Sequence, residues 1–176
     1  MNFIQPYDFD FNIGKAYNEA CEPLEGWICI TDQDTLKFEG FAQRVKQITD
    51  IADKTQVITC ITNRLRKDNE NVIHELYNES DINIHKDKFD ELWTTYGTQL
   101  EQTKMPIAGV CMIFHKTVWE KVKFIEKAIN FDSLFTHSCK RAGFTTHVAK
   151  GLYIFHLYRW GRNVADTSHL FSSKYL

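Results

Sequence analysis

Two aspartates stand where a buried strand is expected to end. Asp32 and Asp34 follow Trp27–Thr31, a continuous apolar and β-branched run that is too short for a helix and predicts a strand buried on both faces. Open α/β sheets bind ligands beyond the carboxyl ends of their strands, and carboxylate oxygens suit Mg²⁺ or Mn²⁺, which keep positions open for phosphates. The spacing therefore predicts a divalent-cation site. A solvated turn, in which Asp34 or Thr35 caps a following helix, is the alternative interpretation.

The elements that must position these carboxylates alternate along the chain. Short apolar or β-branched runs predict strands, and apolar residues at helical spacing predict the helices between them. The expected strands cover residues 3–7, 27–31, 56–62, 109–115, 144–149 and 152–156, and the expected helices cover residues 12–20, 41–52, 89–100, 117–122 and 132–141. This alternation predicts an α/β or α+β layered domain with a mixed sheet. We expect one domain over residues 1–176, with residues 163–176 as a loosely attached tail.

The composition narrows the class of protein. Hydrophobic residues are 43% and charged residues 25% of the chain, which is typical of soluble globular proteins, and the net charge of -2 gives no broad positive field for nonspecific binding of nucleic acid. No apolar run approaches the length of a membrane span, and the first residues do not form a signal peptide, so a soluble, cytoplasmic protein is expected. The five cysteines are scattered and indicate neither a disulfide framework nor a structural zinc site.

Several segments carry a family resemblance, in the same order along the chain. They are Gly14-Lys15-x-x-Asn18 before the Asp32-Gln33-Asp34 strand, the apolar strand 107–114 that contains Gly109, the stretch from 124–126 to Asp132, and the closing segment 151–160 with His156. Together they resemble the GT-A glycosyltransferases, especially family 2. The resemblance implies a GT-A-like α/β fold with a mixed, mostly parallel sheet flanked by helices. It also implies transfer of a sugar from a nucleotide-sugar donor, most simply a UDP-sugar, with Mn²⁺ or Mg²⁺ as cofactor.

The same resemblance assigns roles to individual residues. Asp32, Asp34 and His156 would hold the metal, with Asp34 the direct ligand and Asp32 nearer the ribose or a metal-bound water. Asp132 would be the catalytic base that takes the proton from the acceptor hydroxyl, while a charge in the first turn of a helix is its alternative interpretation. The expected donor-binding residues are Tyr7, Asp8, Lys15, Asn18, Asp32, Gln33, Gly109, Arg159 and Trp160.

Some of these donor-binding residues have a more specific expected role. Lys15 and Asn18 would reach the diphosphate or brace the loop that carries the metal, Arg159 would pair with phosphate, and Trp160 would stack on the sugar. Only 31 residues precede the Asp-x-Asp motif, far fewer than the family usually has. The simplest account is that the first strand is kept and the next unit of the nucleotide-binding half is deleted. Tyr7 or Asp8 would then still meet the base, and a second subunit in a homo-oligomer would complete the pocket.

Other functions stay open on the sequence alone. The acceptor is unknown and is a glycan, a protein or a modified nucleobase. A catalytically silent GT-A-like binding protein is one alternative. A nucleotidyltransferase is another, although the expected glycine-rich triphosphate loop near the first strand is missing from the sequence. A metal-dependent phosphohydrolase would need more carboxylates and histidines at separate strand ends.

Overall fold

The computed structural model describes residues 1–10, 12–65 and 70–157. Strands and helices alternate in this part of the chain, as the sequence predicts. Their order is β1 (Asn2–Ile4), α1 (Ile13–Cys21), β2 (Trp27–Thr31), β3 (Thr35–Leu36), α2 (Phe41–Ile51), β4 (Gln56–Thr62), the short 3-10 helix η1 (His74–Leu76), α3 (Ile82–Tyr96), β5 (Leu100–Gln102), β6 (Cys111–His115), α4 (Lys116–Lys121), α5 (Phe131–Arg141) and β7 (Thr145–His156). The protein is therefore α/β, with a seven-stranded sheet flanked by five α-helices in the described residues.

The sheet is mixed, in the order β1-β2-β6-β4-β7-β3, and β5 pairs with β7 away from this path. β1 runs parallel to β2, and β4 runs parallel to β7. The other four pairings, β2 with β6, β4 with β6, β3 with β7 and β5 with β7, are antiparallel. The mixed sheet is confirmed, whereas the expectation that it is mostly parallel is wrong. A buried apolar strand has the same hydrophobic pattern in either direction, so strand polarity could not be predicted from that pattern.

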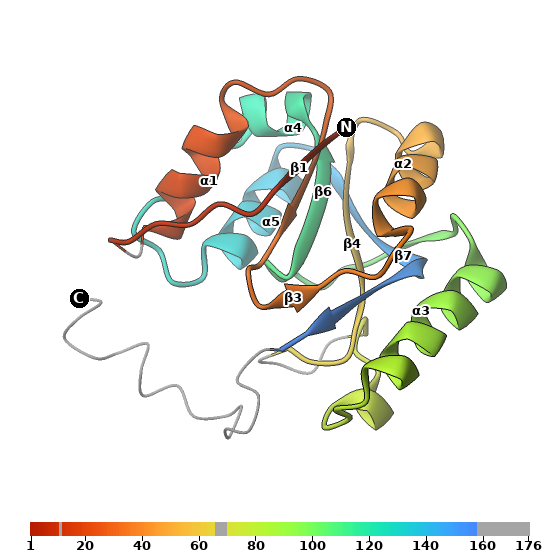
Figure 1. The fold of residues 1–176 in the computed structure, drawn as a ribbon. Helices are drawn as coiled ribbons and strands as arrows, with labels where there is room; N and C mark the ends of the chain where they lie inside the picture. Colours follow the sequence, from red (N-terminus) through yellow and green to blue (C-terminus); the bar gives the residue numbers. More distant parts are fainter. Residues whose placement is uncertain (11, 66–69, 158–176) are drawn as a thin grey trace.

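Two apolar cores lie on opposite faces of the sheet. Helices α1, α4 and α5 cover one face, and α2 and α3 cover the other (Figure 1). Side chains of the central strands alternate between them: Ile28 and Ile30 of β2 belong to the core beneath α1, while Cys29 between them belongs to the core beneath α2 and α3. This alternation is the period of two expected for a strand buried on both faces.

The long strand β7 differs from the two strands expected in its place. It runs without a break from Thr145 to His156, and its register with β4 shifts between Cys60 and Ile61. In this stretch Gly151 passes close to the end of α3, where a Cβ atom on Gly151 would lie 2.1 Å from the carbonyl oxygen of Gly97. The two residues left between the expected strands, 150 and 151, are therefore part of one continuous strand, in which Gly151 allows a close approach of two backbones.

The helix α3 and the short strands β3 and β5 also depart from expectation. α3 runs from Ile82 to Tyr96 and is capped by Gly97, whose positive φ of 50° stops the helix, so Leu100 enters β5 and does not extend the helix. The strands β3 and β5 were not predicted.

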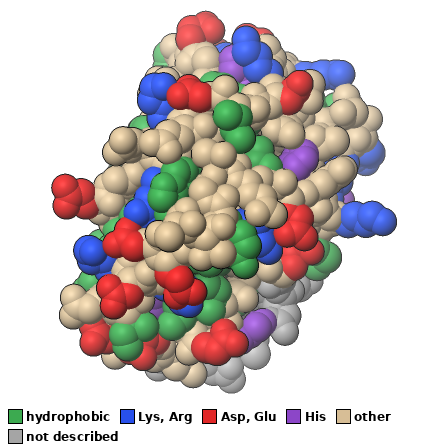
Figure 2. All heavy atoms as spheres, turned by 90° about the vertical axis from the view of Figure 1, so that its right-hand side faces the viewer, with side chains coloured by type: hydrophobic (Ala, Val, Ile, Leu, Met, Phe, Trp, Pro, Cys, Tyr) green, Lys and Arg blue, Asp and Glu red, His purple; other side chains and the backbone are tan. Residues whose placement is uncertain are grey.

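On the face that carries α2 and α3, acidic and basic side chains are interspersed (Figure 2). Of the helices that the structure describes, none combines the length and apolarity needed to cross a membrane.

Candidate metal centre

The Asp-x-Asp segment is a turn that connects β2 to the edge of β7. The hydroxyl of Thr35 donates to the carbonyl oxygen of Asp32 at 2.6 Å and closes this turn. The next two residues form β3, which pairs antiparallel with the end of β7 so that Thr35 lies opposite His156. The amide of Leu157 donates to the carbonyl oxygen of Asp34 at 2.8 Å. The turn and the end of β7 are thus fixed to each other through the backbone.

This pairing brings together the three residues expected to share an ion. One ligand atom from each of Asp32, Asp34 and His156 lies within 4.8 Å of the others. Nε2 of His156 is 3.2 Å from Oδ1 of Asp34. His156 is only 3% exposed, whereas the side chain of Asp34 is 46% exposed, so the cluster is buried on one side and open to solvent on the other. Two carboxylates and one imidazole are a donor set that Mn²⁺ accepts, and the open side would leave coordination positions for a ligand.

The two carboxylates of the cluster differ in their electrostatics. Burial raises the pKa of Asp32 from its usual 3.8 to about 6, with further raising by the charges of Asp34 and Asp132, while His156 and the hydrogen bond from Tyr17 oppose the rise. Burial also disfavours ionisation of Asp34, but the hydrogen bond and charge of His156 outweigh it and lower the pKa of Asp34. A bound cation would favour the ionised form of Asp32 and so offset the effect of burial.

Tyr17 of α1 is a contact of the cluster that sequence reasoning missed. Its hydroxyl donates to Oδ1 of Asp32 at 3.2 Å, and the residue is 2% exposed. Burial, together with the neighbouring charge of Asp32, raises the pKa of Tyr17 well above its usual value, so the hydroxyl keeps its proton and remains a donor. Gln5, just after β1, donates to the carbonyl oxygen of Asp32 at 3.0 Å. Both β1 and α1 therefore hold Asp32 in place.

Asp132 lies beside Asp32, with Gly109 between them. Asp132 is in the first turn of α5, where its Oδ2 accepts the amide of Gly109 at 3.0 Å and its Oδ1 accepts the amide of Ser133 at 2.6 Å. A Cβ atom on Gly109 would lie 3.4 Å from Oδ1 of Asp32. Burial raises the pKa of Asp132 despite these hydrogen bonds, which favour its charged form. A carboxylate with a raised pKa next to a candidate cation site is suited to accept a proton.

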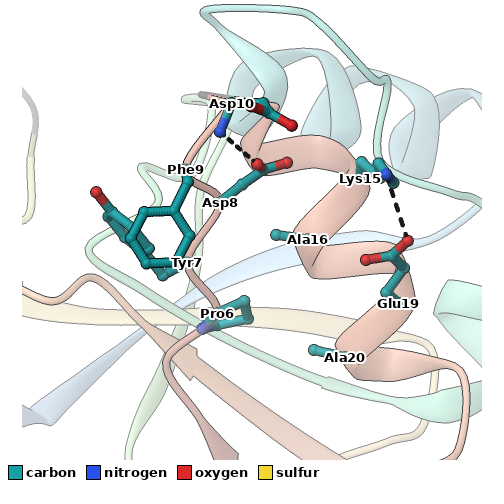
Figure 3. A pocket seen from close by; sticks show the side chains of 9 residues that line it. All are labelled: Pro6, Tyr7, Asp8, Phe9, Asp10, Lys15, Ala16, Glu19 and Ala20. Atoms are coloured by element: carbon teal, nitrogen blue, oxygen red, sulfur yellow. Dashed lines mark hydrogen bonds and ion pairs between the residues drawn. The ribbon is translucent and has the colours of Figure 1, made fainter.

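Three of the expected donor-binding residues line one hollow between the segment after β1 and the helix α1. Tyr7, Asp8 and Lys15 face a space of about 410 Å³, whose other walls are Pro6, Phe9, Asp10, Ala16, Glu19 and Ala20. Ala16 and Ala20 point from α1 toward the Pro6 to Asp10 segment, as Figure 3 shows. None of Asp32, Asp34 and His156 lines this hollow, and the chain links the two only through Gln5 and Tyr17, which precede or follow lining residues in sequence and contact Asp32.

The remaining expected donor-binding residues fall in three different places. Gln33 is exposed in the turn between the two aspartates. The side chain of Asn18 accepts from the amide of Phe124 at 3.0 Å and from Trp119 at 3.2 Å, and donates to the carbonyl oxygen of Phe124 at 2.9 Å. It braces the segment after α4 and not the Asp32–Asp34 turn, so its expected contact with the diphosphate is not supported. Arg159, Trp160 and the expected tail at residues 163–176 lie outside the described residues.

Sequence comparison assigns no family to this chain. Models of known protein families and curated proteins were compared with this chain, and neither comparison found a match.

Proposed function

We propose that this protein is a metal-dependent glycosyltransferase of the GT-A type, which moves a sugar from a nucleotide-sugar donor, most simply a UDP-sugar, to an acceptor hydroxyl. The observation that carries the proposal is the convergence of Asp32, Asp34 and His156 at the end of β2 and β7, with ligand atoms within 4.8 Å of one another. A cation held there as Mn²⁺ or Mg²⁺ would neutralise the charge that develops on the leaving diphosphate.

The surrounding residues supply the remaining parts of such a reaction. Asp132, beside Asp32, would take the proton from the acceptor hydroxyl as its oxygen bonds to the sugar carbon and the bond from that carbon to the diphosphate breaks. Tyr7 would stack on the base in the hollow along α1, and Asp8 would accept a hydrogen bond from the base or ribose. Lys15, at the same hollow, forms an exposed ion pair with Glu19 at 3.7 Å. A phosphate group of the donor could replace Glu19 as the partner of Lys15.

A second candidate function has one observation in its favour. Nε2 of His156 already contacts Oδ1 of Asp34 at 3.2 Å, so the cluster is held together without an ion. A catalytically silent GT-A-like protein that binds a partner or a carbohydrate would need no more than this.

Thermal unfolding with nucleotides and manganese tests the proposal. UDP with Mn²⁺ should raise the melting temperature of the wild-type chain by mass action, and either one alone should raise it less. Asp34→Ala should remove the shift, while Asp50→Ala, at an exposed aspartate of α2, should retain it. Release of UDP from a UDP-sugar in the presence of Mn²⁺ would then demonstrate the enzyme. A full rise in melting temperature without release of UDP, whichever acceptor is added, would favour the catalytically silent protein. No rise with any nucleoside diphosphate would refute the donor site.

A further inference from the structure

The backbone of His156 is held by one buried side chain. Asn63 is 0% exposed and directly follows β4. Its Oδ1 accepts the amide of His156 at 2.8 Å, and its Nδ2 donates to the carbonyl oxygen of His156 at 3.3 Å. The parallel ladder between β4 and β7 ends two residues earlier in β7, where Thr62 pairs with Ile154. The side-chain amide of Asn63 therefore makes the hydrogen bonds to the backbone of His156 that the β4 backbone would make if the ladder continued.

The residue after Asn63 fixes the imidazole ring. Nδ1 of His156 lies 2.7 Å from the carbonyl oxygen of Arg64. A carbonyl oxygen only accepts hydrogen bonds, so Nδ1 must carry the proton. Nε2 is then the nitrogen that faces Asp34: it donates to this carboxylate when the ring is charged, and it can bind a metal when the ring is neutral. Two consecutive residues thus determine the position of His156 along β7 and the tautomer of its ring.

These two residues are themselves anchored in the core. Thr62, just before Asn63, donates its amide to the carbonyl oxygen of Asn71 at 2.9 Å and accepts the amide of Ile73 at 2.9 Å. The end of β4 is therefore paired on the side away from β7 as well. A buried side-chain amide is unfavourable without hydrogen-bond partners, and the backbone of His156 supplies two of them to Asn63.

We propose that Asn63, together with the carbonyl oxygen of Arg64, is a positioning clamp that presents Nε2 of His156 to the metal. This inference rests on the proposed function, because it takes the cluster of Asp32, Asp34 and His156 to be a metal site. Removal of a group that orients a metal-binding histidine in this way typically lowers metal affinity by about 10-fold to 100-fold.

Binding of Mn²⁺ alone to the full chain tests the clamp. The loss of the EPR signal of the free ion measures this binding. Asn63→Ala should weaken Mn²⁺ binding by about 10-fold to 100-fold. The matched control is Asn71→Ala, which removes an equally buried amide, 2% exposed, that donates to the carbonyl oxygen of Cys60 and does not touch His156. Asn71→Ala should bind Mn²⁺ as the wild type does. Equal affinities in the two variants would overturn the clamp. Failure of the wild type to bind Mn²⁺ would instead refute the metal site on which the proposed function depends.

A second measurement uses the wild-type chain and so does not depend on the variant folding. In ¹⁵N-histidine NMR with Zn²⁺ as a diamagnetic probe, the His156 signals, identified from their absence in His156→Gln, should show Nδ1 protonated and Nε2 bound to the metal. Metal binding through Nδ1, or rapid exchange of the Nδ1 proton in the metal-free protein, would overturn the proposal.

Discussion

Replacement of Asp32 by asparagine is expected to stabilise the metal-free protein while it abolishes metal binding. Burial raises the pKa of Asp32 from 3.8 to about 6, which is a shift of about two units. Each unit corresponds to about 1.36 kcal/mol, so ionised Asp32 destabilises the folded protein by about 3 kcal/mol near neutral pH. Asparagine has nearly the same shape and no charge, and its oxygen can still accept the hydrogen bond from Tyr17. The gain expected for Asp32→Asn is therefore about 2 to 3 kcal/mol.

The pH dependence of this gain follows from the direction of the shift. A carboxyl group whose pKa is raised by folding stabilises the folded state in its protonated form, so its contribution is complete below the unfolded pKa of 3.8 and is lost as the pH rises through about 6. The difference in unfolding free energy between Asp32→Asn and wild type should accordingly be small at about pH 4 and reach its plateau above about pH 7.

Urea unfolding in the presence of a chelator, at several pH values, measures this difference. Asp50→Asn serves as the control, because Asp50 is exposed on α2 and its substitution should change stability by less than about 0.5 kcal/mol. A variant that is less stable than wild type at neutral pH, or a gain that does not vary with pH, would refute the reasoning. Added Mn²⁺ should stabilise the wild type and leave Asp32→Asn unchanged.

Two further substitutions test the surroundings of the cluster. Tyr17→Phe removes the hydrogen bond that lowers the pKa of Asp32, so Mn²⁺ binding measured as a function of pH should require a higher pH, and an unchanged midpoint would contradict this role. In Gly14→Ala, the new Cβ atom would lie 2.2 Å from the carbonyl oxygen of Ile125, so we expect destabilisation by more than about 2 kcal/mol in urea unfolding, and a loss below about 0.5 kcal/mol would mean that the two backbones separate easily.

The local elements around the site could largely be predicted from the sequence. The bounds of β2 and β4 agree with the expected strands, because each is a continuous apolar or β-branched run with polar residues at its ends. The helix α2 likewise begins at Phe41, the first residue with helical apolar spacing. In each case the pattern lies within a few residues of the chain and reflects burial directly.

Contacts between distant parts of the chain could not be predicted in this way. The strand β3 has only two residues and is defined by its pairing with β7, so no periodicity marks it. Tyr17 lies on the apolar face of α1, where an aromatic residue indicates a core position and says nothing of the partner of its hydroxyl. Asn63 is the first residue of a charged and polar stretch, residues 63–70, whose composition is typical of an exposed loop, although the side chain of Asn63 is fully buried. The expectation that His156 joins the aspartates came from the family resemblance and not from any local pattern.

The short strand β3 also bears on when the proposed metal site can form. It directly follows Asp34 and pairs Thr35 with His156, so it closes a loop of more than a hundred residues, and we expect such a contact to form late in folding because its entropy of closure is high. An ion that needs both Asp34 and His156 as ligands cannot bind until β7 has docked against the sheet. We therefore expect the cation to slow unfolding and to leave the rate of folding almost unchanged, so that its protection is kinetic.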